Sequence, residues 1–167
     1  MHDQLTKKDI ERLQEEIDYR KQVVRQDAIK AVKEAREQGD LSENFEYTAA
    51  KKEKNRNESR IRYLERMIKT AEVISDESAD DEVGLNNTVT LFFEDEGESE
   101  TYKIVTTIRE DSLEGRISNV SPVGKAVLGH KVGERVYVKI NDHTGYYVVI
   151  QAVDKTTDEG TDRIQSY

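Results

Sequence analysis

The feature that most constrains the fold is a long stretch without helix breakers. Residues 6–75 contain no proline, and their only glycine is Gly39. Because glycine and proline are the residues least suited to a helix interior, this stretch is predicted to be helical with one interruption. Hydrophobic residues make up 35% of the 167 and charged residues 37%, which is too polar for one large core. A long solvated helical element beside a small globular domain fits this composition.

The spacing of apolar residues predicts a coiled-coil seam on each side of Gly39. Ile10, Ile17, Val24 and Ala31 are seven residues apart in the first arm. The second arm carries apolar residues at three- and four-residue steps, namely Ala50, Ile61, Leu64, Ile68 and Ala71. Such spacing places apolar side chains on one face of a helix.

The two seams match if the arms fold back antiparallel around the turn. Ile10 then faces Ala71, Ala31 faces Ala50, and Asp27 faces Lys54 as a possible ion pair. Two poorer matches in the same register are Arg20 with Ile61 and Val24 with Asn57. The midpoint of this register falls between Asp40 and Leu41, within the run "GDLSEN" at 39–44.

The second half of the chain has a different pattern. The acidic run "SDESADDEV" at 75–83 is typical of a linker, and short strand-like runs follow it, such as "TVTLFF" and "ERVYVKI". Val136, Val138 and Ile140 show the alternation of a half-buried strand. In "SPVGKAVLG", Ser121 is a candidate N-cap, Pro122 fits the first helical position, and Gly129 fits just past the end of one short helix.

These patterns define an α+β fold class with four segments. We expect an antiparallel helical coiled-coil hairpin over residues 1–75 with its acidic tip at 39–44, and a linker over 76–83. A mostly antiparallel sheet domain with one short helix is expected over 84–154. The tail 155–167 has little apolar content, so it is predicted to be mobile.

Charge and composition restrict the compartment and the partners. Residues 1–75 hold 17 Lys and Arg against 16 Asp and Glu, which leaves 9 against 19 in residues 76–167. The acidic second half argues against contact with duplex DNA there, so any nucleic-acid contact is expected in the first half. No apolar run approaches the ~20 residues that a membrane helix needs, and the N-terminus lacks a signal-peptide core. The absence of cysteine is compatible with a reducing compartment such as a bacterial cytoplasm.

The turn carries two carboxylates, Asp40 and Glu43, for which two explanations compete. Asp40 could cap the second helix with Glu43 at its N3 position, as in a capping box. Alternatively, two carboxylates three residues apart have neighbouring side chains and can hold part of the coordination sphere of Mg²⁺. Two ligands make only half a site, so a partner would supply the rest.

Two separated motifs resemble the Gre transcript-cleavage factors of the GreA type. "EAREQGDLSENFEYTAAK" at 34–51 is similar to the tip signature of that family, and "ISNVSPVGKAVLG" at 117–129 to its C-terminal signature. The resemblance spans roughly residues 5–154. It implies that a C-terminal FKBP-like domain docks on bacterial RNA polymerase while the coiled coil reaches down the secondary channel to the active site.

The resemblance also implies a role for individual residues. Asp40 and Glu43 would help to hold a second Mg²⁺ jointly with the polymerase, whose own centre then cuts backtracked nascent RNA near its 3′ end. No metal is expected in the isolated protein, which would be a cytoplasmic monomer and an accessory factor rather than an enzyme. Leu41, Ser121, Pro122 and Gly124 fall on matching positions as candidate polymerase contacts, and Arg36 and Lys51 as candidate contacts to RNA phosphates. Lys52 is expected to be an ordinary exposed charge.

The sequence departs from the family pattern at two places. Phe45 replaces a smaller residue and could either pack under the turn or contact the channel wall. The proline that many relatives have near Arg25 and Gln26 is absent, so the first arm should run straighter or have a slightly different register.

Three alternative functions remain open at this point. The first is a regulator that enters the same polymerase channel without stimulating cleavage. A prolyl isomerase is suggested only by the expected fold, which is a poor guide to activity. A coiled-coil scaffold would not bind polymerase at all.

Overall fold

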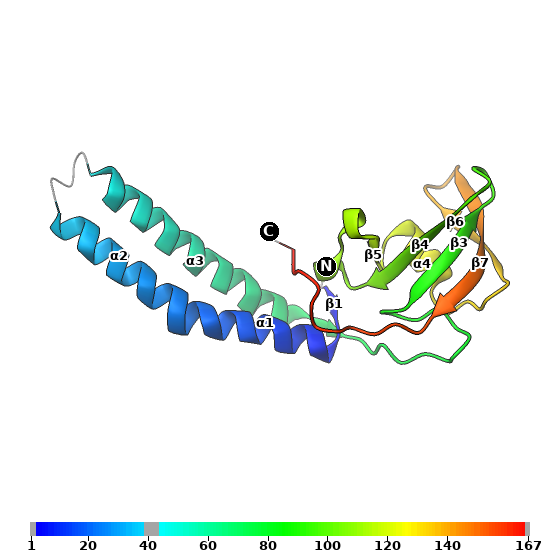
Figure 1. Ribbon diagram of the computed structural model, residues 1–167, viewed down its shortest axis with the longest axis horizontal. Coiled ribbons are helices and arrows are strands. Elements are labelled where there is room, and N and C mark those ends of the chain that lie inside the picture. Colours follow the sequence, from blue (N-terminus) through cyan, green and yellow to red (C-terminus); the bar gives the residue numbers. More distant parts are fainter. Residues whose placement is uncertain (1–2, 39–43, 166–167) are drawn as a thin grey trace. The chain divides into compact units, whose positions relative to one another are not determined.

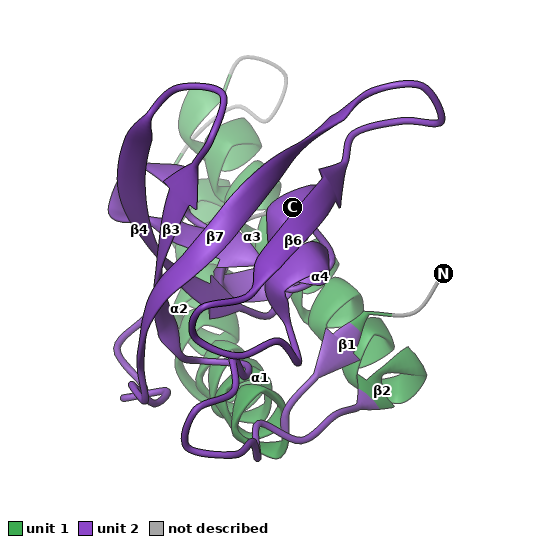
Figure 2. Ribbon diagram, turned by 90° about the vertical axis from the view of Figure 1, so that its right-hand side faces the viewer, with its two compact units in different colours: residues 1–3, 7–72 green, residues 4–6, 73–167 purple. Residues whose placement is uncertain are grey.

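A computed structural model describes residues 3–38 and 44–165, which form two compact units. Unit 1 contains residues 7–72 with the N-terminal residues up to 3, and unit 2 contains residues 4–6 and those from 73 onward (Figure 2). Unit 1 is a helical hairpin, and unit 2 is a small sheet with one short α-helix among its described residues. The predicted α+β class is therefore confirmed.

The hairpin of unit 1 has an interrupted first arm and a continuous second arm. The first arm consists of α1 (Lys7–Tyr19), a π-helical turn η1 (Arg20–Val24) and α2 (Arg25–Glu37). The second arm is the single helix α3 (Phe45–Thr70), which packs along α1 and α2 (Figure 1). Leu13, Ile17, Ile61 and Leu64 are fully buried between the arms, as the apolar spacing predicts.

Farther along the first arm, the predicted register is wrong. Ala31 is exposed, whereas the next residue, Val32, is half-buried. The cross-arm ion pair near this level joins Arg25 to Glu58 rather than Asp27 to Lys54, and it is bidentate at 2.7 and 2.8 Å. The hydrogen bonds from Arg25 lower the pKa of the Glu58 carboxyl. The register change follows from the π turn.

The two ends of the hairpin meet in a short two-stranded sheet. β1 (Gln4–Leu5) pairs with β2 (Glu72–Val73). Glu72 donates its amide to the carbonyl of Asp3, and Ile74 donates to the carbonyl of Leu5, both at 2.9 Å.

Unit 2 contains a five-stranded sheet with the order β5-β4-β3-β7-β6. The strands are β3 (Thr88–Phe93), β4 (Glu98–Val105), β5 (Arg116–Ser118), β6 (Arg135–Lys139) and β7 (Gly145–Asp154). All neighbours are antiparallel except β4 and β5, which are parallel and are connected through two 3₁₀ turns, η2 (Thr107–Arg109) and η3 (Ser112–Glu114). This confirms the predicted, mostly antiparallel arrangement.

Strand alternation places one face of this sheet in a compact core. In β3 the buried residues are Val89, Leu91 and Phe93, and in β6 they are Val136 and Val138. The helix α4 (Pro122–Val127) lies against β6 and contributes the fully buried Val127. Gly129 follows this helix with a φ of +84°, the left-handed conformation that its position after the helix predicts.

The tail expected to be mobile makes polar contacts in place of apolar ones. The guanidinium of Arg109 is fully buried and donates to Asp162 at 3.1 Å and to Asn86 at 2.7 Å, with Asp158 3.9 Å away. Gln165 donates its amide to the carbonyl of Ile108 at 2.7 Å. Charged and polar contacts thus hold a segment whose composition predicts little packing.

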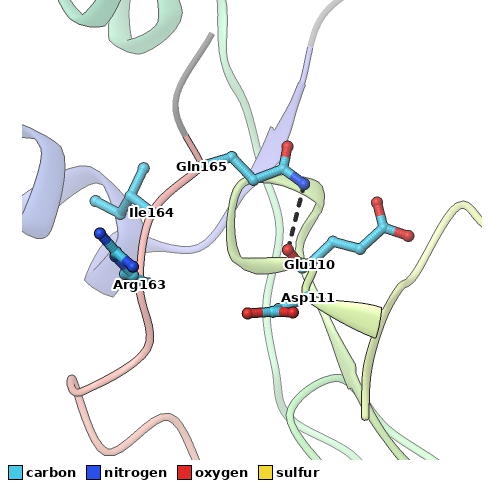
Figure 3. Close-up of a pocket in the computed structure, with 5 residues that line it drawn as sticks. All are labelled: Glu110, Asp111, Arg163, Ile164 and Gln165. Atoms are coloured by element: carbon cyan, nitrogen blue, oxygen red, sulfur yellow. Dashed lines mark hydrogen bonds between the residues drawn. The ribbon is translucent and has the colours of Figure 1, made fainter. Parts of the chain in front are cut away.

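A cavity of about 540 Å³ lies beside this segment. It is lined by Glu110 and Asp111 on one side and by Arg163, Ile164 and Gln165 on the other (Figure 3). The Gln165 side chain donates to the Glu110 carbonyl across it at 3.2 Å. None of the described residues predicted as site residues lines this cavity, so it is separate from the predicted site.

Candidate functional site

The N-cap of α3 is Asn44, which corrects the expected helix start. Its side-chain oxygen accepts a hydrogen bond from the Tyr47 amide at 3.0 Å, and the helix begins at Phe45. The capping box predicted for Asp40 and Glu43 is therefore wrong. Asn44 takes the capping role because its side-chain nitrogen also donates to the Ala35 carbonyl of the opposite arm at 2.6 Å. One amide thus caps α3 and joins it to α2.

Three predicted site residues, Asp40, Leu41 and Glu43, lie outside the described residues. They directly precede Asn44 in the sequence. Because Asn44 caps α3, the N-cap role predicted for Asp40 is taken by another residue. Among the residues that the structure describes, no group of three or more His, Asp or Glu side chains could hold a metal ion.

Arg36 and Lys51 come together in a groove between α2 and α3. The groove has a volume of about 310 Å³, and its polar lining includes Lys33, Lys54 and Tyr47. Lys33 and Arg36 are three residues apart on α2, and Lys51 and Lys54 are three apart on α3, so each pair shares one helix face. Lys52 does not line the groove, which agrees with its predicted role as an ordinary surface charge.

Tyr47 positions one of these cations. The Arg36 guanidinium donates to the Tyr47 hydroxyl at 3.3 Å and lies 5.5 Å from the centre of the ring. This hydrogen bond, with a further contribution from the Lys51 charge, lowers the pKa of the Tyr47 phenol. Lys33, Lys51 and Lys54 form no ion pair with any described residue. The groove therefore gathers positive charge between the two arms, although Lys54 also acts on the Glu58 carboxylate.

The second motif builds a tight loop at the start of α4. Ser121 caps the helix by accepting from the Gly124 amide at 3.1 Å, and its hydroxyl donates to the Ser118 carbonyl at 2.6 Å. A Cβ atom on residue 124 would lie only 2.2 Å from that carbonyl oxygen, so only glycine fits. Pro122 is exposed. The contacts explain Ser121 and Gly124 structurally and leave Pro122 free on the surface.

Sequence reasoning missed some residues and left others undecided. The cap at Asn44 was missed because Asp40, Ser42 and Asn44 are all good N-cap residues. Lys33 was not predicted as a residue of the groove, although its three-residue spacing from Arg36 places both side chains on one face of α2. Phe45 is 87% exposed, so it packs little against the residues that the structure describes.

Comparisons with known proteins identify the family. Residues 3–73 match the family "Transcription elongation factor, N-terminal", and residues 77–155 match "Transcription elongation factor, GreA/GreB, C-term". The chain is 45% identical over 136 residues to transcription elongation factor GreA of Geobacillus kaustophilus, covering 81% of this chain and 86% of that protein. It is 43% identical over 129 residues to GreA of Bacillus subtilis, covering 77% and 82%.

A solved structure is also similar. The GreA factor homolog 1 protein of Thermus thermophilus is 30% identical, with 92% of this chain and 99% of that chain covered and a TM-score of 0.43. The two matched family domains and the two GreA relatives define a two-domain transcription factor. The chain belongs to the GreA/GreB family of transcription elongation factors.

The same comparisons bear on the class of activity. The relatives are named as elongation factors rather than as enzymes. In the described part of the chain, no helix has the length and apolar character required to span a membrane.

Proposed function

We propose that this chain binds bacterial RNA polymerase, inserts its hairpin into the secondary channel and stimulates cleavage of backtracked nascent RNA. Asp40 and Glu43 would hold Mg²⁺ jointly with the polymerase, and this ion would activate the attacking water and stabilise the displaced oxygen. The bond cleavage itself would take place in the polymerase, so the chain acts as an accessory factor. It would act as a monomer in the cytoplasm.

The observation that carries this proposal is the cap of α3. Asn44 is the N-cap of α3 and satisfies the Tyr47 amide, so Asp40 is not required as the N-cap of this helix. Two carboxylates so close in the sequence repel one another, and a bound cation would remove that repulsion. A pair of carboxylates at this position is consistent with metal binding.

The groove supplies the second part of the proposed function. Arg36 and Lys51 would contact phosphates of the displaced RNA 3′ segment, with Lys33 and Lys54 extending the positive track. Contacts to phosphates need no base recognition, because charge alone supplies the attraction. The exposed Phe45 and Pro122 would contact the polymerase, and Leu41 would do so at the tip.

The test uses a stalled bacterial transcription complex with backtracked RNA and measures the rate of RNA shortening. Asp40→Asn and Glu43→Gln should each slow the factor-dependent rate by about tenfold or more, equivalent to at least about 1.4 kcal/mol. Both variants should still compete with the wild-type chain for polymerase. The matched control is Glu46→Gln, which removes an exposed carboxylate from the first turn of α3 and should cleave normally.

The outcomes separate the candidate functions. Unchanged cleavage by Asp40→Asn and Glu43→Gln would refute the metal-binding role. If the wild-type chain binds polymerase but shortens no RNA, the alternative of a non-cleaving regulator of the same channel is correct. A chain that does not bind polymerase would be a scaffold.

The groove has its own matched pair of variants. Raising the salt concentration should slow cleavage less steeply in Lys51→Gln than in the wild type. Each lost phosphate contact reduces the slope of log affinity against log salt concentration by about 0.7. Lys52→Gln removes the neighbouring charge outside the groove and should leave the slope unchanged. Equal slopes for the two variants would argue against an RNA contact in the groove.

A further inference from the structure

The residues that face α3 shift by one position along the first arm. The predicted seam would place Asp27 and Ala31 inward, but both are exposed. Ala28 and Val32 are half-buried instead, and Ala35 is buried. Each inward position therefore lies one residue later than the heptad spacing predicts. A change of one residue is what a single insertion into a helix produces.

The π turn η1 is the structural source of this shift. Arg25 donates its amide to the carbonyl of Arg20, five residues earlier, rather than to a partner four residues earlier. A π turn accommodates one extra residue within an otherwise α-helical segment. Figure 1 shows the first arm changing direction between α1 and α2, where this turn lies. The π turn thus gives the first arm a register that differs from its heptad spacing.

Asn57 of the opposite arm contacts this turn in two ways. Its side-chain nitrogen donates to the Arg20 carbonyl at 3.2 Å, and its oxygen accepts from the Arg20 guanidinium at 3.1 Å. The residue is only 4% exposed, so water does not readily replace these bonds. The Arg20 carbonyl therefore accepts from both Arg25 and Asn57.

A carboxylate completes the polar layer around Asn57. Glu16 accepts from Arg20 at 2.7 Å and from Arg60 of the opposite arm at 2.9 Å. Arg60 is itself only 8% exposed. A buried polar layer in a helical seam adds little stability compared with apolar packing, but it can select one register over others.

We propose that Asn57 is a positioning residue that holds the π turn and so fixes which face of α2 meets α3. Without the surplus residue of the π turn, every residue beyond it rotates by about 100° and shifts by about 1.5 Å. Arg36 would then leave the groove that it shares with Tyr47 and Lys51. Asn57 lies three helical turns from Tyr47 along α3, so it acts on the site only through the arm.

The register can be measured without any polymerase. The chain has no cysteine, so pairs of spin labels can be attached at introduced cysteines without background. Lys30 with Lys52 reports on the arms beyond the π turn, and Glu15 with Arg66 reports on the arms before it. All four positions are exposed.

Asn57→Leu should replace the polar contacts with apolar packing and let the first arm become a continuous α-helix. A rotation of about 100° on a helix of about 10 Å diameter moves the Lys30 label by about 8 Å. The Lys30–Lys52 distance should therefore change by several ångströms, while the Glu15–Arg66 distance stays as in the wild type. The thermal midpoint should be unchanged or higher. Asn57→Asp keeps an acceptor for the Arg20 guanidinium but cannot donate to the carbonyl, and it should show the same shift.

A second change provides a rescue. Deleting the exposed Gln22 from the Asn57→Leu chain removes the surplus residue directly. The same face of α2 as in the wild type should then contact α3. The Lys30–Lys52 distance should then recover. A wild-type distance in Asn57→Leu or Asn57→Asp, or a deletion that fails to restore it, would overturn the proposal.

Cleavage gives a functional readout that rests on the proposed function. Asn57→Leu should bind polymerase normally but cleave about tenfold more slowly, and deletion of Gln22 should restore the rate. A merely structural role would lower the thermal midpoint and the activity together. If the wild-type chain itself does not cleave, the proposed function fails, whereas the label distances still decide the role of Asn57.

Discussion

Gly124 offers the sharpest test of how the loop before α4 is built. A Cβ atom there would lie 2.2 Å from the Ser118 carbonyl oxygen and 3.0 Å from the Ser121 hydroxyl oxygen. The nearer contact is about 1 Å shorter than packed atoms allow, and the obstructing atom belongs to the backbone, which cannot rotate away. Gly124→Ala must therefore displace either α4 or the end of β5.

The expected cost follows from the packing of this region. Gly124 is buried, and overpacking a well-packed site typically costs about 1–3 kcal/mol. In a unit of this size each kcal/mol lowers the melting temperature by about 4–8 °C, so a fall of roughly 4–24 °C is expected. Thermal unfolding followed by circular dichroism of the full chain measures this.

The control and the refuting result are both specific. Lys125→Ala changes the next residue of the same helix, which is exposed, and should stay within about 0.5 kcal/mol of the wild type. If Gly124→Ala melts within about 2 °C of the wild type, the close approach is not a real constraint. The glycine would then be better explained by a contact with polymerase. Pro122→Ala should give the converse result, with weaker polymerase binding and an unchanged melting temperature.

Three further predictions concern other parts of the molecule. Asn44→Ala should destabilise the hairpin by about 1–2 kcal/mol and speed hydrogen exchange at the start of α3, because the cap and the cross-arm bond are lost together. Burial alone would raise the pKa of Glu16, but hydrogen bonds led by that from Arg60 lower it overall. The stability that Glu16 contributes is therefore present above the ordinary glutamate pKa and disappears as the pH falls through the lowered value, so Glu16→Gln should flatten the acid dependence of the thermal midpoint. Removing residues 156–167 takes both aspartates, Asp158 and Asp162, from the buried Arg109. The free energy of unfolding of unit 2, measured by denaturant titration, should fall by about 3 kcal/mol or more. A loss below about 1 kcal/mol would mean that the tail contacts contribute little.

The parts of the fold that were predictable depend on local signals. A long run without proline, interrupted at Gly39, determines a helical hairpin because few alternatives are compatible with it. Ser121, Pro122 and Gly129 delimit α4 because each residue satisfies a requirement of its own position in a helix terminus. Strands β3 and β6 follow from alternation over five or more residues. None of these features depends on what the segment packs against.

The features that were not predictable depend on residues far apart in the sequence. Asp40 and Asn44 are equally good caps in isolation, and the bond from Asn44 to the Ala35 carbonyl on the other arm decides between them. The polar tail provides no apolar pattern, yet two of its aspartates neutralise the buried Arg109. Both outcomes rest on a partner that local propensity cannot identify.

The π turn has both a local signal in the sequence and a cause that depends on residues far apart in the chain. Arg20 and Asn57 appear in the predicted register only as two separate mismatches, each opposite an apolar residue. In the structure they contact one another, so the mismatches arise from a single cause. The Arg20 guanidinium donates to the Asn57 side chain, and the Arg20 carbonyl at the start of the π turn accepts from the same side chain. A polar residue in each arm at the same level of an otherwise apolar seam is thus better explained as a paired layer than as two defects, and such a layer is expected wherever the facing positions change by one residue.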